Sequence, residues 1–155
     1  MLTALIICMK VLIAGLYGYV IFTIIQAKSA DRTIEIRLDL LSDIEVCFVT
    51  GLSLVSVFSR ISDSTLVFTA CLCAIALILA FFQSRRLIFA GNEKVYLRNK
   101  VCDQKKLISI QPEKLVFLKI QMKSRAERIY FPLTDHNALQ KIQDNLKRKN
   151  RKKSH

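Results

Sequence analysis

Residues 66–86 of this 155-residue chain read LVFTACLCAIALILAFFQSRR. No charged side chain occurs from Leu66 to Phe82, and the stretch then ends at the basic pair Arg85–Arg86. An α-helix needs about 20 mainly apolar residues to cross the hydrocarbon core of a bilayer, and basic residues collect at its cytoplasmic end. The stretch therefore predicts a transmembrane span at about 66–82 that leaves the membrane at Arg85–Arg86.

The charge of the chain changes at the same pair. Residues 1–84 carry 5 Lys and Arg against 6 Asp and Glu, a net charge of −1, whereas residues 85–155 carry 19 against 6, a net charge of +13. A soluble domain would intersperse charged and apolar residues, and their segregation is typical of a membrane protein with an aqueous appendage. We therefore expect a membrane region at 1–84, a basic module at 85–146 and a polybasic tail at 147–155.

Two further apolar stretches precede this span. The first, at about 2–25, has Lys10 as its only charged residue, and the second, at about 44–58, is joined to the third by a short hairpin loop. No charged region precedes the first stretch, so we expect it to be retained as a helix and not cleaved as a signal peptide. The sequence thus predicts three transmembrane helices.

The loops between these helices differ in their basic residues. The loop at 26–43 contains Lys28, Arg32 and Arg37, the hairpin loop contains only Arg60, and the segment after the third span contains 19 Lys and Arg. Loops that carry an excess of Lys and Arg are cytoplasmic. We therefore predict a plasma-membrane protein whose N-terminus is outside and whose C-terminus is in the cytoplasm.

The loop at 26–43 contains a pattern of alternating side chains. Its apolar members are Ile34, Ile36, Leu38 and Leu40, and the charged residues between them are Glu35, Arg37 and Asp39. This is the period of a half-buried strand, and a lone strand is not stable in water. We favour a strand at about 33–41 that joins a cytosolic sheet, and an amphipathic helix on the membrane surface is the alternative.

Short strand patterns follow Arg85–Arg86. Residues 86–90 and 94–98 flank Gly91-Asn92 and predict a β-hairpin. The remaining strands are expected at 106–110, 115–122 and 127–131, with a turn at 111–113. These segments predict a small antiparallel sheet.

A final helix is expected to cover one face of this sheet. Thr134 or Asp135 can cap its first turn by accepting hydrogen bonds from free backbone N–H groups. Its apolar stripe, at helical spacing, consists of Ala138, Leu139, Ile142 and Leu146. The predicted fold class is therefore a membrane α+β protein, with three transmembrane helices followed by a small cytosolic antiparallel β-sheet and a C-terminal helix.

The residue types needed for catalysis do not occur together. His136 and His155 lack neighbours that would complete a metal site or an acyl-transfer relay, and no glycine-rich phosphate loop is present. The cysteines are Cys8, Cys47, Cys71, Cys73 and Cys102. Four of them lie in apolar stretches, so we expect buried, reduced thiols that act as small hydrophobic residues. We therefore expect no enzyme activity, metal or cofactor.

Two charged side chains lie near opposite ends of the predicted spans. The predicted orientation places Lys10 near the outer face and Glu45 near the inner face. We therefore expect no direct ion pair between them, and we expect Lys10 to extend toward the lipid headgroups. A role in an ion pathway is the alternative.

The C-terminus is strongly basic, with six basic residues in the seven at 147–153. Such a run suits a solvated helix end, where cations interact favourably with the helix dipole, and it also suits attraction to anionic lipids. Binding to nucleic acid is disfavoured because no aromatic side chains interleave the charges. The candidate lipid-surface contacts are Arg85, Arg86, Lys147, Arg148, Lys149, Arg151, Lys152 and Lys153.

The layout of the chain resembles the YobD-like family of small bacterial inner-membrane proteins. The residues that carry the resemblance are 85–89 (RRLIF), 128–132 (RIYFP) and 135–142 (DHNALQKI). The resemblance implies three spans in a bacterial inner membrane. It implies no functional residues, because the family has no assigned activity, and the basic run after Leu146 departs from the family pattern.

These observations favour a non-enzymatic multi-pass membrane protein. Its partners are expected to be the lipid bilayer, anionic lipid headgroups through the basic module, or a membrane or cytosolic protein. The alternative is a small transporter or a transport-accessory subunit, in which Lys10 and Glu45 would be the charged groups inside the membrane.

Overall fold

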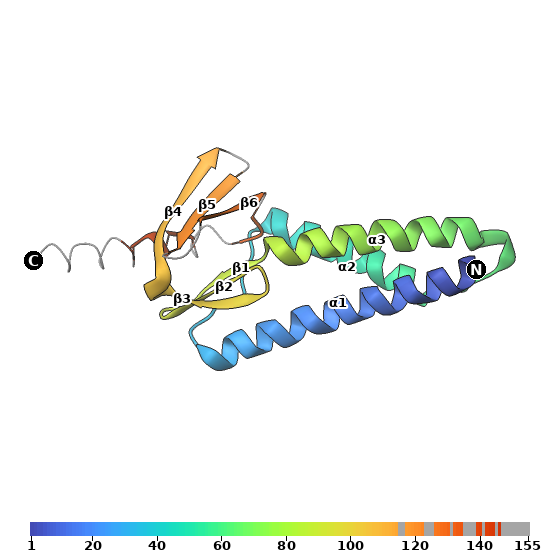
Figure 1. Cartoon of the computed structure of the whole chain (residues 1–155), viewed down its shortest axis with the longest axis horizontal. Coiled ribbons are helices and arrows are strands. Elements are labelled where there is room, and N and C mark those ends of the chain that lie inside the picture. Colours follow the sequence, from blue (N-terminus) through green and yellow to red (C-terminus); the bar gives the residue numbers. More distant parts are fainter. Residues whose placement is uncertain are drawn as a thin grey trace, which may run out of the picture. The chain divides into compact units, whose positions relative to one another are not determined.

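A computed structural model of the chain describes residues 1–114, 117–122, 126–130, 132–134, 139–140, 142–144 and 146 (Figure 1). The chain divides into two compact units. The helical unit consists of Met1–Phe22 and Leu40–Ser84, and the sheet unit consists of Thr23–Asp39 and Arg85–His155. Each unit is described by itself.

The apolar stretches form three long helices, α1 (Leu2–Ala30), α2 (Leu40–Phe58) and α3 (Leu66–Arg86). By length and composition each of them can cross a membrane. A 3₁₀ turn at Asp63–Thr65 lies between α2 and α3. This confirms the three expected helices, and each extends a few residues beyond its predicted apolar stretch at one end.

Helix α1 is longer than a membrane crossing requires. Its 29 residues correspond to about 44 Å at 1.5 Å per residue, whereas the hydrocarbon core of a bilayer is about 30 Å thick. The helix continues through Ala30, and from Thr23 onward its residues belong to the sheet unit. The end of α1 therefore belongs to the same compact unit as the strands, whereas the sequence predicts that only the loop segment at 33–41 joins them.

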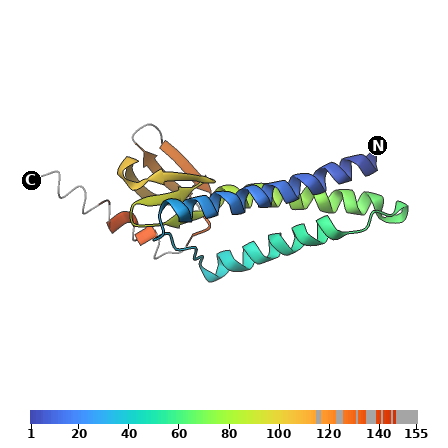
Figure 2. The same ribbon diagram turned by 90° about the horizontal axis from the view of Figure 1, so that it is seen from below.

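The three helices run side by side in the helical unit, with α2 antiparallel to α1 and α3 (Figure 2). Their buried residues recur at heptad spacing. These are Ile6, Ile13 and Val20 on α1 and Thr69, Cys73, Ala76 and Ala80 on α3. This spacing is typical of helices that cross at a small angle. Large apolar side chains such as Phe22, Phe48 and Phe68 remain exposed, as expected for helices that face lipid.

The sheet unit contains two three-stranded antiparallel sheets among the described residues (Figure 1). The first consists of β1 (Ile88–Ala90), β2 (Lys94–Leu97) and β3 (Lys100–Asp103), in that order. The second consists of β4 (Leu107–Lys114), β5 (Phe117–Met122) and β6 (Ala126–Tyr130). A 3₁₀ turn at Gln104–Lys106 joins the two sheets.

Both sheets share one hydrophobic core. Its members include Ile88, Val95, Leu107, Ile120 and Ile129, and they pack with Ile142 and Leu146. The described residues at 139–140, 142–144 and 146 are helical. The strands of the first sheet are short, and the second sheet by itself has two exposed edges. Small sheets of this kind need a packed face to be stable, so the shared core stabilises both.

The structure confirms the hairpin about Gly91-Asn92, since β1 pairs with β2 and Phe89 lies opposite Tyr96. It corrects the expected single sheet to two. The sequence does not predict strand β3, because the two-residue turn before it, at Arg98–Asn99, contains no glycine. Both turn residues have positive φ, 48° and 61°, which is the conformation that favours tight hairpins.

Two further expectations are wrong. The turn expected at 111–113 lies inside β4, where Pro112 is tolerated beside a register shift. The strand expected at 33–41 is absent, since residues 34–39 form neither helix nor strand and α2 begins at Leu40. The alternative surface helix at this position is also wrong. The expected helix cap at Asp135, the stripe residue Ala138 and the polybasic tail at 147–155 lie outside the described residues.

Candidate functional site

Arg85 and Arg86 are the last two residues of α3. The Arg85 side chain is exposed and the Arg86 side chain is half-buried. Both are in the last turn, where a positive charge interacts favourably with the helix dipole. The backbone here is fixed, because Leu133 donates its N–H to the Arg86 carbonyl at 2.9 Å and accepts from the Ile88 N–H at 3.0 Å. The other candidate lipid contacts, from Lys147 to Lys153, lie outside the described residues.

Among the exposed charged side chains in the described part of the sheet unit, basic residues outnumber acidic ones. The exposed basic residues are Lys28, Arg32, Arg37, Arg85, Arg98, Lys100, Lys105, Lys106 and Arg128. The exposed acidic residues are Glu35, Glu93 and Asp144. One of the basic residues, Lys106, lies 3.7 Å from the carboxylate of Asp103. The folded surface is therefore positive even without the C-terminal run.

The loop after α1 is bound to the turn between β1 and β2. Oδ2 of Asp31 accepts hydrogen bonds from the backbone N–H groups of Glu93 and Lys94, each at 3.0 Å. Oδ1 of Asp31 accepts from the backbone N–H of Thr33 at 3.0 Å and from its hydroxyl at 2.5 Å. Thr33 Oγ1 in turn accepts from the Asn92 N–H at 2.7 Å. We call this arrangement of Asp31, Thr33 and residues 91–94 the Asp31 clamp.

Gly91 allows the clamp to close. A Cβ at this position would overlap Oδ2 of Asp31 and Cγ1 of Ile34, so only glycine fits. The Gly91 carbonyl accepts a hydrogen bond from Nε2 of Gln104 at 2.7 Å, and its N–H donates to the Lys94 carbonyl at 2.9 Å. The turn is thus fixed by its contacts with Asp31, Gln104 and Lys94.

The environment of Asp31 favours its charged form. Burial raises the pKa of its carboxyl group, but the hydrogen bonds from Thr33, Glu93 and Lys94 lower the pKa by more and leave it well below the ordinary value. Asp31 is therefore ionised at neutral pH, and its bonds to the N–H groups are charge-assisted.

A second contact attaches the end of α1 to the first sheet. Tyr96 is fully buried, and its hydroxyl donates to Oδ1 of Asn99 at 2.9 Å. The hydroxyl groups of Thr23 and Tyr96 lie 3.0 Å apart and form a hydrogen bond. Phe89 packs beside Tyr96 with the ring centroids 5.6 Å apart. Residues 23–39 therefore cover the face of β1 and β2 that the shared core does not.

Lys10 is bound within the helical unit. Its Nζ donates to the carbonyl oxygen of Ser59, and it lies 3.2 Å from the hydroxyl oxygen of the same residue. Ser59 directly follows α2, where carbonyl groups lack partners within the helix. Glu45 precedes Ser59 by 14 residues, which corresponds to about 21 Å along α2. Lys10 and Glu45 therefore do not meet, as the sequence predicts.

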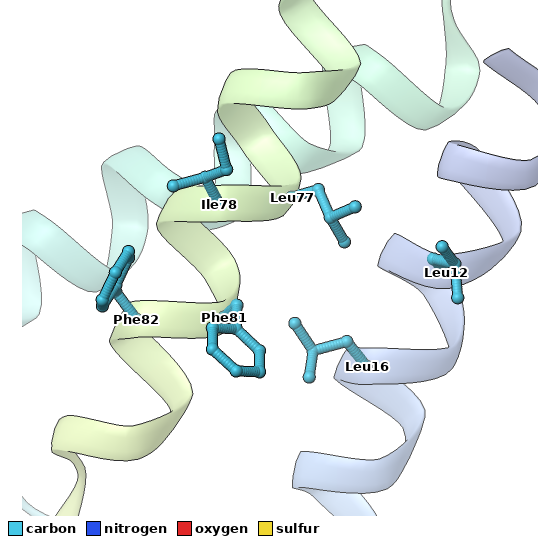
Figure 3. A pocket seen from close by; sticks show the side chains of 6 residues that line it. All are labelled: Leu12, Leu16, Leu77, Ile78, Phe81 and Phe82. Carbon is cyan, nitrogen blue, oxygen red and sulfur yellow. The ribbon is translucent and has the colours of Figure 1, made fainter. Parts of the chain in front are cut away.

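An apolar groove of about 450 Å³ lies between α1 and α3 in the helical unit (Figure 3). Its lining residues are Leu12, Leu16, Leu77, Ile78, Phe81 and Phe82, and no polar atom contributes to it. Leu16 of α1 faces Leu77 and Phe81 of α3 across the gap (Figure 3). We call this feature the α1–α3 groove.

The cysteines are free thiols in the structure. Cys8, Cys47 and Cys71 are exposed on the apolar helices, Cys73 is buried and Cys102 is half-buried. The expectation that the thiols are buried is therefore wrong for Cys8, Cys47 and Cys71, because apolar side chains on these helices also face outward. Among the described residues, no three His, Cys, Asp or Glu side chains come close enough to hold a metal ion. His136 and His155 lie outside the described residues.

Comparisons of the chain with protein-family models, curated proteins and solved structures find no significant match. The resemblance to the YobD-like family therefore stays a prediction.

Sequence reasoning did not single out the residues of the Asp31 clamp. A local signal exists, since Asp-x-Thr directly after a helix is a pattern in which the Asp side chain binds the backbone two residues on. Nothing in that pattern indicates the second half of the contact, which is 62 residues further along the chain.

Proposed function

We propose that this chain is a non-enzymatic, multi-pass inner-membrane protein of bacteria whose basic sheet unit binds the anionic lipid surface of the cytoplasmic leaflet. The observation that carries the proposal is the charge of the sheet unit, whose exposed charged side chains are mainly basic. Each Lys or Arg near an anionic leaflet contributes about 1 kcal/mol of attraction. The attraction fades over about 8 Å at physiological salt, so it requires a unit attached to the membrane.

The composition of the sheet unit supports the proposed orientation. Residues 23–39 and residues 85–155 belong to one compact unit, although two apolar helices separate them in the chain. In a three-span protein both segments are then on the same face of the membrane. This face has the excess of Lys and Arg, which is typical of the cytoplasm.

The test uses the full chain in nanodiscs. Hydrogen exchange of the sheet unit is compared between discs of phosphatidylcholine alone and discs that also contain phosphatidylglycerol. We expect slower exchange around Lys100, Lys105 and Lys106 in the anionic discs, and we expect high salt to remove the difference. Replacing these three lysines with glutamine should also remove it, whereas the control Arg60→Gln, in the loop between α2 and α3, should not.

Equal exchange in both kinds of disc would contradict the proposal. A protein partner would then be the remaining ligand of the basic surface, and cross-linking of the full chain in its native membrane would identify it.

The transporter alternative has less support. Lys10 is bound at the end of α2 and Glu45 lies about 21 Å away along that helix, so the two do not form a charged pair inside the membrane. Solute flux into vesicles that is lost in both Lys10→Ala and Glu45→Ala would favour a transporter. Flux that neither substitution affects would not.

A further inference from the structure

We propose that residues 25–37, which we call the connecting segment, lie in the headgroup layer of an anionic bilayer. Two isoleucine side chains of the segment insert between the lipids, and its exposed basic side chains bind lipid phosphates. The whole segment belongs to the sheet unit. The inference rests on the proposed affinity of the sheet unit for anionic lipid, and it goes further because it names the residues that enter the bilayer.

The outer face of α1 indicates where the headgroup layer meets this helix. Ile25 is 62% exposed, and Lys28, which is also exposed, follows it by three residues, or about 4.5 Å along the helix axis. A membrane-crossing helix changes from apolar to basic in this way where acyl chains give way to headgroups, and the lysine extends toward the phosphates. The last apolar turn of α1 therefore ends in the headgroup layer.

The opposite face of the same turn holds the first sheet. Residues two apart are about 200° apart around a helix, so Thr23 and Ile25 lie on nearly opposite sides of α1. Thr23 is buried, and its hydroxyl forms a hydrogen bond with that of Tyr96 in β2. The first sheet therefore contacts α1 at the level where the outer face of the helix meets the headgroups.

Ile36 is the second apolar side chain of the segment. In the strand that the sequence predicts, Ile34 and Ile36 would both be buried on one face. No strand forms here, and Ile34 is 3% exposed whereas Ile36 is 47% exposed. Helix α2, which is long and apolar enough to cross a membrane, begins four residues later at Leu40, at most about 14 Å of chain away. Because removing apolar surface from water is favourable, Ile36 is stabilised at the boundary of headgroups and acyl chains.

The charges of the connecting segment complement anionic lipids. Lys28, Arg32 and Arg37 are exposed, and in the described part of the chain their side chains form no hydrogen bond or ion pair. Of the two acidic residues in the segment, Asp31 is bound in the clamp and only Glu35 is exposed. A guanidinium binds two phosphate oxygens at once. The segment therefore combines exposed apolar side chains with a positive charge, as surfaces that lie in an anionic interface do.

Tryptophan fluorescence of the full chain in nanodiscs tests the insertion, because the chain contains no tryptophan. The discs contain equal amounts of phosphatidylcholine and phosphatidylglycerol, and the phosphatidylcholine carries bromine on its acyl chains near the headgroup. We expect Ile25→Trp and Ile36→Trp to show blue-shifted emission and strong quenching by bromine. The matched control is Ile108→Trp, at a position on β4 that is 46% exposed, and it should emit as in water with little quenching. This control also accounts for the affinity of tryptophan itself for the interface.

The basic residues are tested by moving the bromine from phosphatidylcholine to phosphatidylglycerol in discs of the same composition. We expect stronger quenching of Ile36→Trp by the brominated phosphatidylglycerol, because bound phosphates enrich the anionic lipid around the segment. Adding the substitutions Lys28→Gln, Arg32→Gln and Arg37→Gln together should remove this difference. Adding Arg60→Gln, in the loop between α2 and α3, should not.

Quenching of Ile36→Trp that is no stronger than that of Ile108→Trp would overturn the proposal. Equal quenching of Ile36→Trp by the two brominated lipids would overturn it as well. Slow amide exchange in β1 and β2 checks that each variant is folded. If Ile36→Trp does not fold, Arg37→Trp at the next exposed position replaces it and is compared with Ile108→Trp in the same way.

The outcome is distinguishable from failure of the proposed function. Loss of the lipid-dependent exchange protection around Lys100, Lys105 and Lys106, with quenching of Ile36→Trp intact, would contradict surface binding by those lysines only. Loss of the quenching, with the exchange protection intact, would contradict insertion of the connecting segment only.

Discussion

At the residue scale, Asp31 links two segments that are far apart in the chain. Its carboxylate accepts hydrogen bonds from Thr33, Glu93 and Lys94. The backbone N–H groups of the β1–β2 turn would otherwise lack partners on this side. A carboxylate has two acceptor oxygens, whereas a side-chain amide has one and carries a donor NH₂ group in place of the other.

The first prediction concerns the charge of Asp31. Asp31→Asn replaces one acceptor oxygen with a donor that faces other donors. We expect the sheet unit to lose about 1–3 kcal/mol of unfolding free energy at neutral pH. Thermal or denaturant unfolding of the full chain in detergent measures the change. Glu35→Gln, at an exposed position of the same loop, is the control and should unfold as the wild type does.

The loss of unfolding free energy in Asp31→Asn is expected to depend on pH. The folded-state pKa of Asp31 is lowered, so its stabilising contribution is fully present above the unfolded-state pKa of about 3.9. It is lost as the pH falls through the folded-state pKa. We therefore expect the difference between wild type and Asp31→Asn to be constant from pH 8 to about pH 5 and to narrow below about pH 4. A difference that narrows near neutral pH would contradict the assignment.

The second prediction concerns Gly91. The added Cβ of Gly91→Ala would overlap Asp31 and Ile34, so the clamp has to open or the turn has to shift. Overpacking of this kind costs about 1–3 kcal/mol. We expect faster hydrogen exchange of the Glu93 and Lys94 amides in the full chain. Exchange as slow as in the wild type would show that the turn accommodates a side chain. Ala90→Gly, one residue earlier, controls for a change of backbone flexibility.

At the element scale, α3 combines an apolar sequence with a buried polar end. Gln83 and Ser84 are both buried. The Ser84 hydroxyl donates to the Phe81 carbonyl at 2.8 Å, whereas Nε2 of Gln83 is a buried nitrogen without a hydrogen-bond partner among the described residues. A buried donor without a partner lowers the free energy of unfolding, so Gln83 destabilises the folded α3.

The third prediction follows from this unpaired group. Gln83→Met keeps the length of the side chain and removes the donor. We expect the free energy of unfolding of the helices to be unchanged or to rise by about 1 kcal/mol, as measured by unfolding in detergent. Gln83→Ala is the matched control, because it removes the donor but leaves a cavity and should not stabilise. A loss of stability in Gln83→Met would indicate that the amide has a role of its own.

At the scale of the whole molecule, the sheet unit is assembled from two segments that flank α2 and α3. Residues 23–39 supply the clamp and the contact of Thr23 with Tyr96, and residues 85–146 supply the strands. Phe89 and Tyr96 are buried on the face where these segments meet. The strands alone would expose this aromatic face to water.

The fourth prediction tests this two-segment unit. A chain in which a long Gly/Ser linker joins residues 23–39 to residues 85–155 should show slow amide exchange in β1 and β2. Residues 85–155 alone should lack that protection and should bind a dye for exposed apolar surface. Equal protection in both chains would mean that the strands fold without the first loop.

The fifth prediction concerns orientation. Reporter fusions at Ser62 and at His155 are expected to lie on opposite faces of the membrane, with the one at His155 in the cytoplasm, because α3 lies between them. A cytoplasmic reporter at Ser62 would contradict the proposed orientation. A fusion within the loop at 31–39 would disrupt the clamp, so these two positions are preferable.

The helices, the charge boundary and the hairpin at Gly91-Asn92 are all predictable from the order of the residues. Long apolar runs and local turn residues depend on neighbouring positions, so each is visible in a short window of sequence. The same reasoning placed Lys10 and Glu45 apart, and it predicts that the third span leaves the membrane at Arg85–Arg86.

The role of the first loop and the division of the strands into two sheets depend on contacts between distant segments. The alternating pattern at 34–40 favoured a strand, but Asp31 and Thr33 bind the β1–β2 turn and leave a single backbone contact, from Glu35 to Ala90, along the edge of β1. Asp31 and its partners in that turn are about 60 residues apart in the chain. Hydrogen bonds over such separations leave no periodic pattern in either segment. The partners of each group lie in the other segment, and they are present only when the two segments are folded together.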